Sequence, residues 1–403
     1  MSAIGGIADL VRGGVEFAAL DKMRIAMGMR GRERSAAYLD DRIFMLYNSS
    51  STEAFENDFE LQPAIFERGG HIYVLCIDSD ELCAAAVFER YRTEGVDFLG
   101  TLEHSFSLAL YDGERDMLLL ARDRRGAKPL FYKTVGERLY FASEIKGIYA
   151  AMGGGISVSR EMLSLHLTAP LGVYRATDIF TELCEVLAGE CVIFTELGYS
   201  RFRYRDRTVR HSRPKIKRGD EVLVPYPAVE PSDIDESLRE TLIAFDYPQF
   251  DAEMPSLCRL FADCRRRGRY SVVYEDGARQ KSPSYACERQ DRLGALFGIS
   301  ASGVLPRSDA ERRTYATDAM HDALLERALS LRCEQVALLR SVFGEKKYEY
   351  LLRRLCEKTK NKDTEDRIRI LGMMLQTVMW AESRELVIKS TGAIADQSAL
   401  SMM

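Results

Sequence analysis

Short apolar runs separated by turn residues fill the first half of the chain. They are rich in Ile, Val, Leu, Phe and Tyr, which is typical of β-strands. The turn Asp-Gly-Glu-Arg at residues 112–115 separates two of these runs and predicts an antiparallel hairpin. Segments 16–27 and 80–92 predict helices, the first with its apolar residues on one side. The predicted strands cover residues 42–47, 71–77, 105–111, 117–121, 130–133, 138–142, 191–195 and 200–204.

The character of the sequence changes after residue 205. Residues 206–231 are charged and contain four prolines, which are unsuited to the interior of helices and strands. Beyond this segment the pattern is mainly helical, and Asp363 is placed to cap a helix that carries Ile368 and Leu371 on its apolar face. We therefore expect two domains: an α+β domain at 1–205 and a mainly helical one at 206–403.

The composition is that of a globular protein in water. Hydrophobic residues make up 46% and charged residues 29% of the 403 residues, and the formal net charge is −5. This weak charge argues against nucleic-acid binding, and no apolar run is long enough to cross a membrane. The start of the sequence does not resemble a secretion signal, so we expect a cytoplasmic protein. Nine cysteines without a CxxC pair and five scattered histidines predict neither a metal site nor disulfides.

Two neighbouring motifs carry a resemblance to a known family. Residues 121–132 read ARDRRGAKPLFY, and residues 141–147 read FASEIKG. They resemble the glutamine amidotransferase domain of asparagine synthetases, in which ARDxxGxKPLYY is followed by FASExKAL. The strand SFSLALYD at 105–112 and the pair Arg30-Gly31, similar to the start of the family's RGPD turn, agree with this. The resemblance implies an Ntn-type αββα sandwich of the class II glutamine amidotransferase kind.

The second half resembles a helical remnant of an asparagine synthetase domain. Residues 246–257 are similar to the family's DEPFxDxSxxPxxL stretch, and residues 291–302 to its DRxSMAxGLExR segment. A strand is expected between them at 271–274. The SGGxDS loop that cradles pyrophosphate in the family does not occur in the sequence. We therefore expect no cofactor, and ATP with Mg²⁺ only if the chain is an enzyme.

The resemblance also assigns a candidate site. Ser2 stands where the family has its nucleophilic cysteine, and Ser49, Asp78 and Ser79 lie in a degenerate glutamine pocket. A serine hydroxyl is a weaker nucleophile at neutral pH than a cysteine thiolate. The family's carboxylate-binding arginine is missing from residues 46–51, and Asp78 stands near the position of the family's Asn-Gly oxyanion donors. A carboxylate there repels the negative charge that develops during the reaction.

These losses lead to three hypotheses. The first is a pseudoenzyme that acts by binding, with an intact asparagine synthetase or a second copy of the chain as its partner. The second is an enzyme of asparagine biosynthesis that uses Ser2 as an N-terminal nucleophile or is completed by a partner chain. The third is a decayed, functionless product, which predicts that the protein shows no cooperative melting. We favour the first.

Overall fold

The computed structural model describes most of the chain, and the structural statements that follow concern these residues. They are 2–31, 34–49, 62–169, 176–204, 233–269, 271–275, 283–297, 299–304, 318–357, 364–383 and 386–389. The predicted linker at 206–231 and the predicted helix cap Asp363 lie outside them. The domain boundary after residue 205 therefore stays a prediction.

A six-stranded antiparallel sheet contains the N-terminal strand β1 near its centre. This strand is buried throughout. A Cβ atom at Gly6 would come within 2.2 Å of the Phe44 carbonyl oxygen, so only glycine fits this position. The strand order is β11 (Cys184–Glu185), β8 (Phe131–Val135), β9 (Arg138–Ala142), β1 (Ser2–Ala8), β3 (Ile43–Ser49) and β2 (Arg34–Leu39).

The second six-stranded sheet is also antiparallel. Its β6–β7 hairpin pairs Asp112 with Met117, which confirms the hairpin predicted from the turn sequence. The Asp112 side chain accepts hydrogen bonds from the backbone N–H groups of Glu114 and Arg115, both at 3.0 Å, and so holds the turn. The strand order is β13 (Gly198–Arg203), β12 (Glu190–Thr195), β7 (Met117–Arg122), β6 (Ser107–Asp112), β5 (His71–Asp78) and β4 (Ala64–Arg68).

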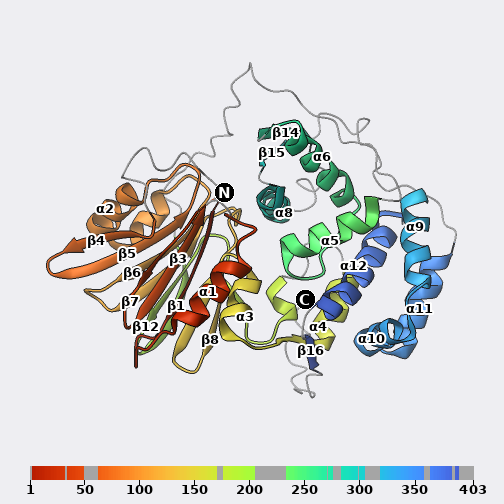
Figure 1. Cartoon of the computed structure of the whole chain (residues 1–403), viewed down its shortest axis with the longest axis horizontal. Helices are drawn as coiled ribbons and strands as arrows, with labels where there is room; N and C mark the ends of the chain where they lie inside the picture. Colours follow the sequence, from red (N-terminus) through yellow and green to blue (C-terminus); the bar gives the residue numbers. More distant parts are fainter. Residues whose placement is uncertain are drawn as a thin grey trace.

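Helices cover the outer faces of the two stacked sheets (Figure 1). The core between the sheets packs residues such as Ile4 of the first sheet against residues such as Val74 of the second. α1 (Phe17–Ala26) and α3 (Ile145–Met152) pack on the outer face of the first sheet, and α2 (Ala84–Glu94) packs on that of the second. The layers are therefore helix, sheet, sheet and helix. This confirms the predicted α+β fold with an Ntn-type αββα sandwich.

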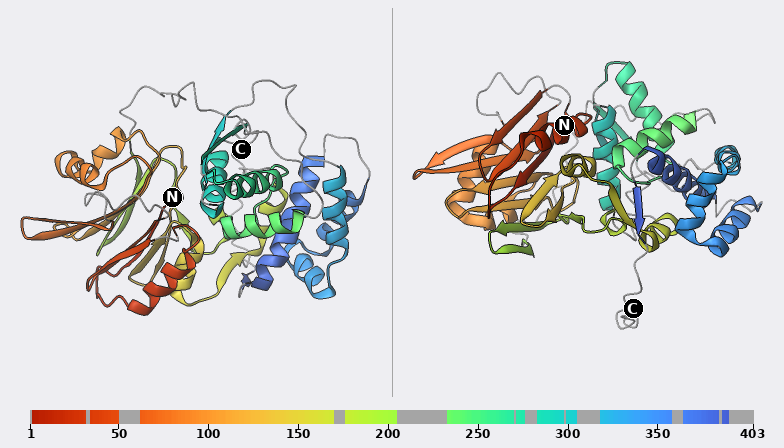
Figure 2. Two further views of the ribbon diagram at one scale, coloured as in Figure 1. Left: turned by 45° about the horizontal axis from the view of Figure 1, so that its top comes forward. Right: turned by 60° about the horizontal axis from the view of Figure 1, so that its bottom comes forward.

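The chain from residue 233 onward is mainly helical, as predicted, and its helices gather on one side of the sandwich (Figure 2). The long helix α12 contacts α5, α9 and α10 and is buried along most of its length. β14 (Ser271–Glu275) lies at the position of the strand predicted at 271–274 and pairs in parallel with β15 (Ser300–Val304). The helices are α5 (Ile234–Phe245), α6 (Met254–Arg266), α8 (Pro283–Phe297), α9 (Asp318–Leu329), α10 (Cys333–Phe343), α11 (Glu345–Cys356) and α12 (Thr364–Ser383).

The sandwich and the helical part share one hydrophobic core. It runs from Leu20 and Met27, beside the first sheet, to Leu242 and Trp380 in the helical part. Between the two parts lie β10 (Ile156–Ser159), α4 (Arg160–Thr168) and the 3-10 turn Ala176–Ile179, whereas the 3-10 turn Gly95–Thr101 follows α2 and packs with it on the second sheet. Strand β16 (Leu386–Lys389), which follows α12, returns to pair in parallel with β10.

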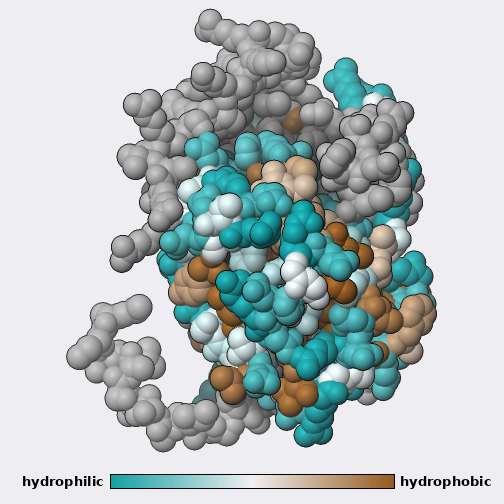
Figure 3. All heavy atoms as spheres, turned by 90° about the vertical axis from the view of Figure 1, so that its left-hand side faces the viewer, coloured by the Kyte–Doolittle hydropathy of each residue, from teal (hydrophilic) through white to brown (hydrophobic). Residues whose placement is uncertain are grey.

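The surface agrees with the composition. The end of the sandwich seen in Figure 3 is mainly hydrophilic, with hydrophobic residues in small separate groups. Scattered apolar side chains of this kind are normal on proteins in water. None of the helices that the structure describes is both long and apolar enough to span a membrane.

Gly372 in α12 provides a test of the packing in the shared core. Glycine to alanine in a helix normally stabilises by about 1 kcal/mol. Here a Cβ atom would lie 2.1 Å from Cδ1 of the buried Phe250, so we expect Gly372→Ala to destabilise by about 1–3 kcal/mol. Urea unfolding followed by circular dichroism measures the change. The matched control Gly154→Ala, which adds its methyl group in open space, is expected to stay within about 0.5 kcal/mol of wild type.

Candidate functional site

Ser2, at the expected position of the nucleophile, is buried between the two sheets. It lies opposite Ser49 of β3 in the antiparallel ladder. Its Oγ donates a 2.6 Å hydrogen bond to Oδ1 of Asp78, the last residue of β5 in the second sheet. Each sheet thus contributes one member of the pair. The structure brings together three of the residues that the sequence predicted for the site.

Arg30 follows the turn after α1 and is 1% exposed. Its Nε donates to the Ser2 carbonyl oxygen at 2.8 Å, and its Nη2 donates to Oδ2 of Asp78 at 3.2 Å. The same Nη2 donates to Oδ2 of Asp291, which belongs to α8 in the helical part. The next residue, Gly31, has φ 110° and lies so close to the backbone of β3 that a Cβ atom would be 2.5 Å from it. Glycine therefore allows Arg30 to enter the site.

The ARDRRGAKPLFY motif forms a tight turn after β7. The Asp123 carboxylate accepts hydrogen bonds from three backbone N–H groups of the turn, the last of them that of Lys128, at 2.9–3.2 Å. Arg122 closes the turn by donating to the carbonyl oxygen of Gly126 at 2.6 Å. These bonds satisfy the backbone of a buried segment and fix the position from which Lys128 reaches the site.

Two cations and two carboxylates form one buried network around Ser2. Arg30, Asp78, Lys128 and Asp291 are each at most 8% exposed. The Nζ of Lys128 lies 3.5 Å from Oδ1 of Asp78 and 3.2 Å from Oδ1 of Asp291. Arg30 binds the other oxygen of each carboxylate. Because the formal charges of the four groups cancel, the network compensates for the cost of burying each of them.

This pairing keeps the two cations and Asp291 ionised. Burial opposes the charge of Lys128, but the carboxylates of Asp78 and Asp291 raise its pKa above the ordinary value. Burial also opposes the charge of Arg30, and the same two carboxylates raise its pKa. Burial favours the neutral form of Asp291, yet Arg30 and Lys128 lower its pKa to about 2. At neutral pH Lys128 is therefore a charged ammonium group and cannot take a proton from Ser2.

A second buried arginine fixes α8 against the sandwich. Arg292 donates to the carbonyl oxygens of Ala244 and Phe245 at the end of α5, at 3.2 and 3.3 Å. Its guanidinium also stands over the ring of Phe131 in β8, 5.4 Å from the ring centroid. Arg292 therefore contacts both parts of the chain, and its neighbour Asp291 is held where it meets Arg30.

The two other predicted site residues, Ser49 and Ser79, differ in whether hydrogen bonds connect them with Ser2. The hydroxyl of Tyr47 forms hydrogen bonds with the side chains of Ser2 and Ser49, so these two serines share one neighbour. Burial raises the pKa of Tyr47 to about 12, which leaves it a neutral phenol at neutral pH. Ser79 instead donates to the Ser105 carbonyl oxygen at 3.0 Å, and no hydrogen bond among the described residues joins it to Ser2.

The sequence patterns do not identify three members of the network: Arg30, Lys128 and Asp291. Each belongs to a motif that carried the family resemblance, and this was the available signal. Their meeting depends on contacts between distant segments, such as the contact between Arg30 and Asp291 across 261 residues. No group of His, Cys, Asp and Glu among the described residues is arranged to hold a metal ion.

Comparison with known proteins agrees with this geometry. Residues 79–205 match the family of the glutamine amidotransferase domain. Asparagine synthetase [glutamine-hydrolyzing] 3 of Bacillus subtilis is 29% identical over 177 residues, which cover 43% of this chain and 27% of that protein. Asparagine synthetase B of Escherichia coli is 30% identical over 170 residues, which cover 37% of this chain and 30% of that protein. The chain thus contains a glutamine amidotransferase-like domain and is similar to asparagine synthetases over part of its length. This confirms the predicted family resemblance.

These matches cover only part of this chain and of each synthetase. The aligned part of this class II amidotransferase-like chain spans less than a third of either synthetase. Its matched domain begins directly after Asp78 and so contains the Lys128 turn but not Ser2 or Arg30. Among solved structures, a glutamine phosphoribosylpyrophosphate amidotransferase from B. subtilis aligns with 82% of this chain and 70% of its own, at 12% identity and a TM-score of 0.35.

The network predicts a large cost for the removal of one carboxylate. Asp291→Asn leaves Arg30 and Lys128 with Asp78 as their one fully buried carboxylate, so we expect a destabilisation of about 3 kcal/mol at pH 7. Urea unfolding measures this difference. The matched control Asp21→Asn breaks an exposed pair with Arg24 and is expected to cost less than about 1 kcal/mol. Equal effects of the two substitutions would contradict the network.

The comparison of wild type with Asp291→Asn also gives a prediction about the pH dependence of stability. The pKa of Asp291 is about 2 in the folded chain, against 3.8 for an aspartate free in water, as in an unfolded chain. Above pH 3.8 both states are ionised and the stabilisation is fully present; as the pH falls towards 2, the unfolded state binds its proton first and the stabilisation is lost. The stability difference between wild type and Asp291→Asn should therefore shrink between pH 5 and pH 2.5. A difference that stays constant over this range would show that Asp291 is not the ionised partner.

Proposed function

We propose that this asparagine synthetase-like protein does not hydrolyse glutamine or make asparagine, and that it acts as a non-catalytic binding or regulatory protein. The observation that carries the proposal is the closed network of Arg30, Lys128, Asp78 and Asp291 at Ser2. Both cations near Ser2 are already bound by carboxylates of the chain itself. Neither is free to bind the carboxylate of a free amino acid.

The state of Ser2 supports the same proposal. Its hydroxyl donates to Asp78, whose carboxylate also binds Arg30 and Lys128. The pKa of Lys128 is raised by Asp78 and Asp291, so its ammonium group is protonated and does not act as a base. An anionic tetrahedral intermediate next to Asp78 would also be repelled. The absence of an SGGxDS string from the sequence supports the loss of the ATP-dependent reaction.

The fold that remains is suited to binding, because the residues that build it are separate from those that perform chemistry. We propose that the protein works in the cytoplasm without a cofactor. Its partner is an intact asparagine synthetase or a second copy of this chain. Copurification with a synthetase from the same organism, and the mass in solution by light scattering, distinguish these two partners.

Ammonia release from glutamine tests the proposal directly. Mass spectrometry first establishes that the purified chain begins at Ser2, since an N-terminal nucleophile requires a free α-amino group. We expect wild type, Ser2→Ala and Ser2→Cys all to release ammonia at the rate of buffer alone, because Arg30 and Lys128 remain occupied in each. No AMP should form from ATP with aspartate.

The outcomes separate the hypotheses. Ammonia release by wild type that Ser2→Ala abolishes would establish the enzyme hypothesis and overturn the proposal. Ammonia release by Ser2→Cys alone would show that the missing thiol, and not the closed network, prevents catalysis. The absence of a cooperative melt would favour a decayed, functionless product.

A further inference from the structure

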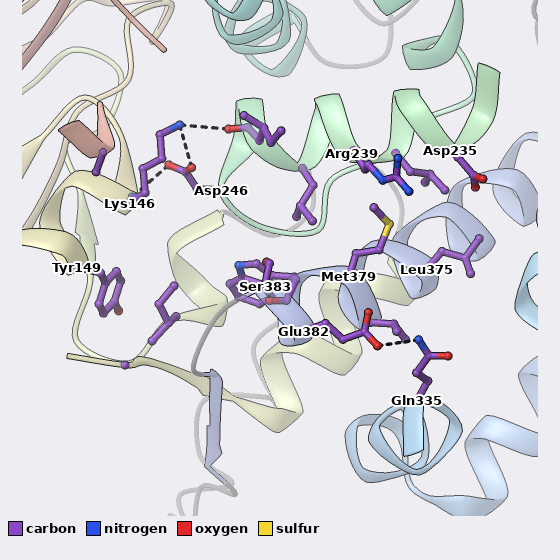
Figure 4. Close-up of a pocket in the computed structure, with 18 of the residues that line it drawn as sticks. Lys146, Tyr149, Asp235, Arg239, Asp246, Gln335, Leu375, Met379, Glu382 and Ser383 are labelled. Atoms are coloured by element: carbon purple, nitrogen blue, oxygen red, sulfur yellow. Dashed lines mark hydrogen bonds and ion pairs between the residues drawn. The ribbon is translucent and has the colours of Figure 1, made fainter. Parts of the chain in front are cut away.

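A large cavity lies outside the Ser2 network, at the junction of the sandwich and the helical part (Figure 4). Its volume is about 1190 Å³, slightly above the range of about 300–1000 Å³ that is usual for small-molecule sites. It is lined by residues of α3, α5, α12 and the glycine-containing turn after α3. None of Ser2, Arg30, Asp78, Lys128 and Asp291 is among them.

One wall of the cavity is apolar. Leu242 and Ile243 of α5 and Leu375 and Met379 of α12 contribute to this wall. The side chain of Ile243 remains 45% exposed, although its helix packs against the shared core. Water in contact with such a wall is released when an apolar ligand binds, which favours binding in proportion to the area covered.

The charged groups around the cavity are paired, with one exception. Lys146 binds Glu144 and Asp246, and Arg327 binds Asp235. Glu382 accepts hydrogen bonds from Arg332 and Gln335.

Arg239 of α5 is exposed and has no ion pair or hydrogen bond among the residues that the structure describes. Figure 4 shows its guanidinium between α5 and α12, on the same side of the helix as the cavity. It is thus a cation that is free to bind a ligand anion at the edge of the apolar wall.

Two further polar groups lack partners. The Tyr149 hydroxyl and the Trp380 indole Nε1 are buried without a hydrogen-bond partner in the described part of the chain, and both residues line the cavity. Buried groups of this kind are normally satisfied, so each unsatisfied one requires an explanation. Small side-chain rotations that accompany the arrival of a ligand acceptor provide one, and both groups can donate to an anion or to a carbonyl oxygen.

We propose that this cavity binds a small molecule with an extended apolar body and one anionic group, such as a carboxylate. The anion binds Arg239, and the apolar body covers Leu242 and Met379. Polyphosphates fit the site less well, because Asp235 and Glu382 place carboxylates at its edge and Arg239 is the one lining cation without a partner among the described residues. The inference goes beyond the proposed function by giving the non-catalytic protein a class of ligand.

Fluorescence titration of the full chain tests this assignment. The probe is anilinonaphthalene sulfonate, an aromatic monoanion, and dodecanoate, dodecanol and ATP are the competitors. We expect saturable binding of the probe, displacement by dodecanoate, weaker displacement by dodecanol and none by ATP at equal concentration. Arg239→Gln should weaken the binding of dodecanoate about tenfold and leave that of dodecanol unchanged.

Two further variants sharpen the experiment. Arg353→Gln is the matched control, because Arg353 is an exposed arginine of α11 without a described partner and outside the cavity. It should bind dodecanoate as wild type does. Ile243→Trp places a large side chain on the exposed part of the wall and should weaken the binding of dodecanoate and dodecanol alike. Circular dichroism melting establishes that each variant is folded.

Three results would overturn the assignment: stronger displacement by ATP than by dodecanoate, equal effects of Arg239→Gln and Arg353→Gln, or no effect of Ile243→Trp. Different results would overturn the ligand assignment and the proposed function. Ammonia release dependent on Ser2 would overturn only the proposed function, because Ser2 does not line the cavity. Loss of selective binding would overturn only the ligand assignment.

Discussion

The structure depends on the mutual neutralisation of Arg30 and Lys128 by Asp78 and Asp291. Each of these groups is buried, and the burial of any one alone would cost several kcal/mol. The network lies where the start of β1 and the end of β5 meet α8, so it joins the sandwich to the helical part. It also shapes the surroundings of Ser2, because both cations of the network are paired with carboxylates of the chain itself.

The family motifs serve this arrangement as structural elements. Asp123 closes the turn that presents Lys128, and Arg292 holds α8 so that Asp291 reaches Arg30. In the DYPQFDAEMP segment, Asp246 accepts the backbone N–H of Lys146 at 3.2 Å, and Asp251 accepts those of the first residues of α6. Motif residues can therefore be explained by their hydrogen bonds, whether or not the reaction once associated with them persists.

The sequence predicted the sandwich well because its strands carry continuous apolar runs. All the strands predicted in the first half are present, with ends within two residues of the predicted ones. The strands that it did not predict lack this signal. β2 is mostly exposed, and β1 interrupts its apolar residues with Gly5 and Gly6. For helices the agreement is weaker at the start of α2, which begins at Ala84 and not at residue 80.

The candidate site was predictable only in part. Ser2, Ser49 and Asp78 lie together in the structure, but the sequence indicated only a degenerate glutamine pocket and not the side chains that surround Ser2. The strand at 46–51 contains no arginine, whereas Arg30 reaches Ser2 from the turn after α1. No local pattern encodes that position, because it results from the packing of α1, β1 and α8. The apolar spacing of α5 and α12 likewise does not reveal that a cavity remains between them.

The contact between Arg30 and Asp291 has a consequence for how the chain can change over evolution. A domain whose buried charged groups are all paired within it can be exchanged, fused or lost as a unit. Here Arg30 and Lys128 of the sandwich are paired with Asp291 of α8, and the hydrophobic core continues across the same junction. Separation of the two parts would therefore remove a buried partner of both cations and expose the apolar surface of the shared core to water.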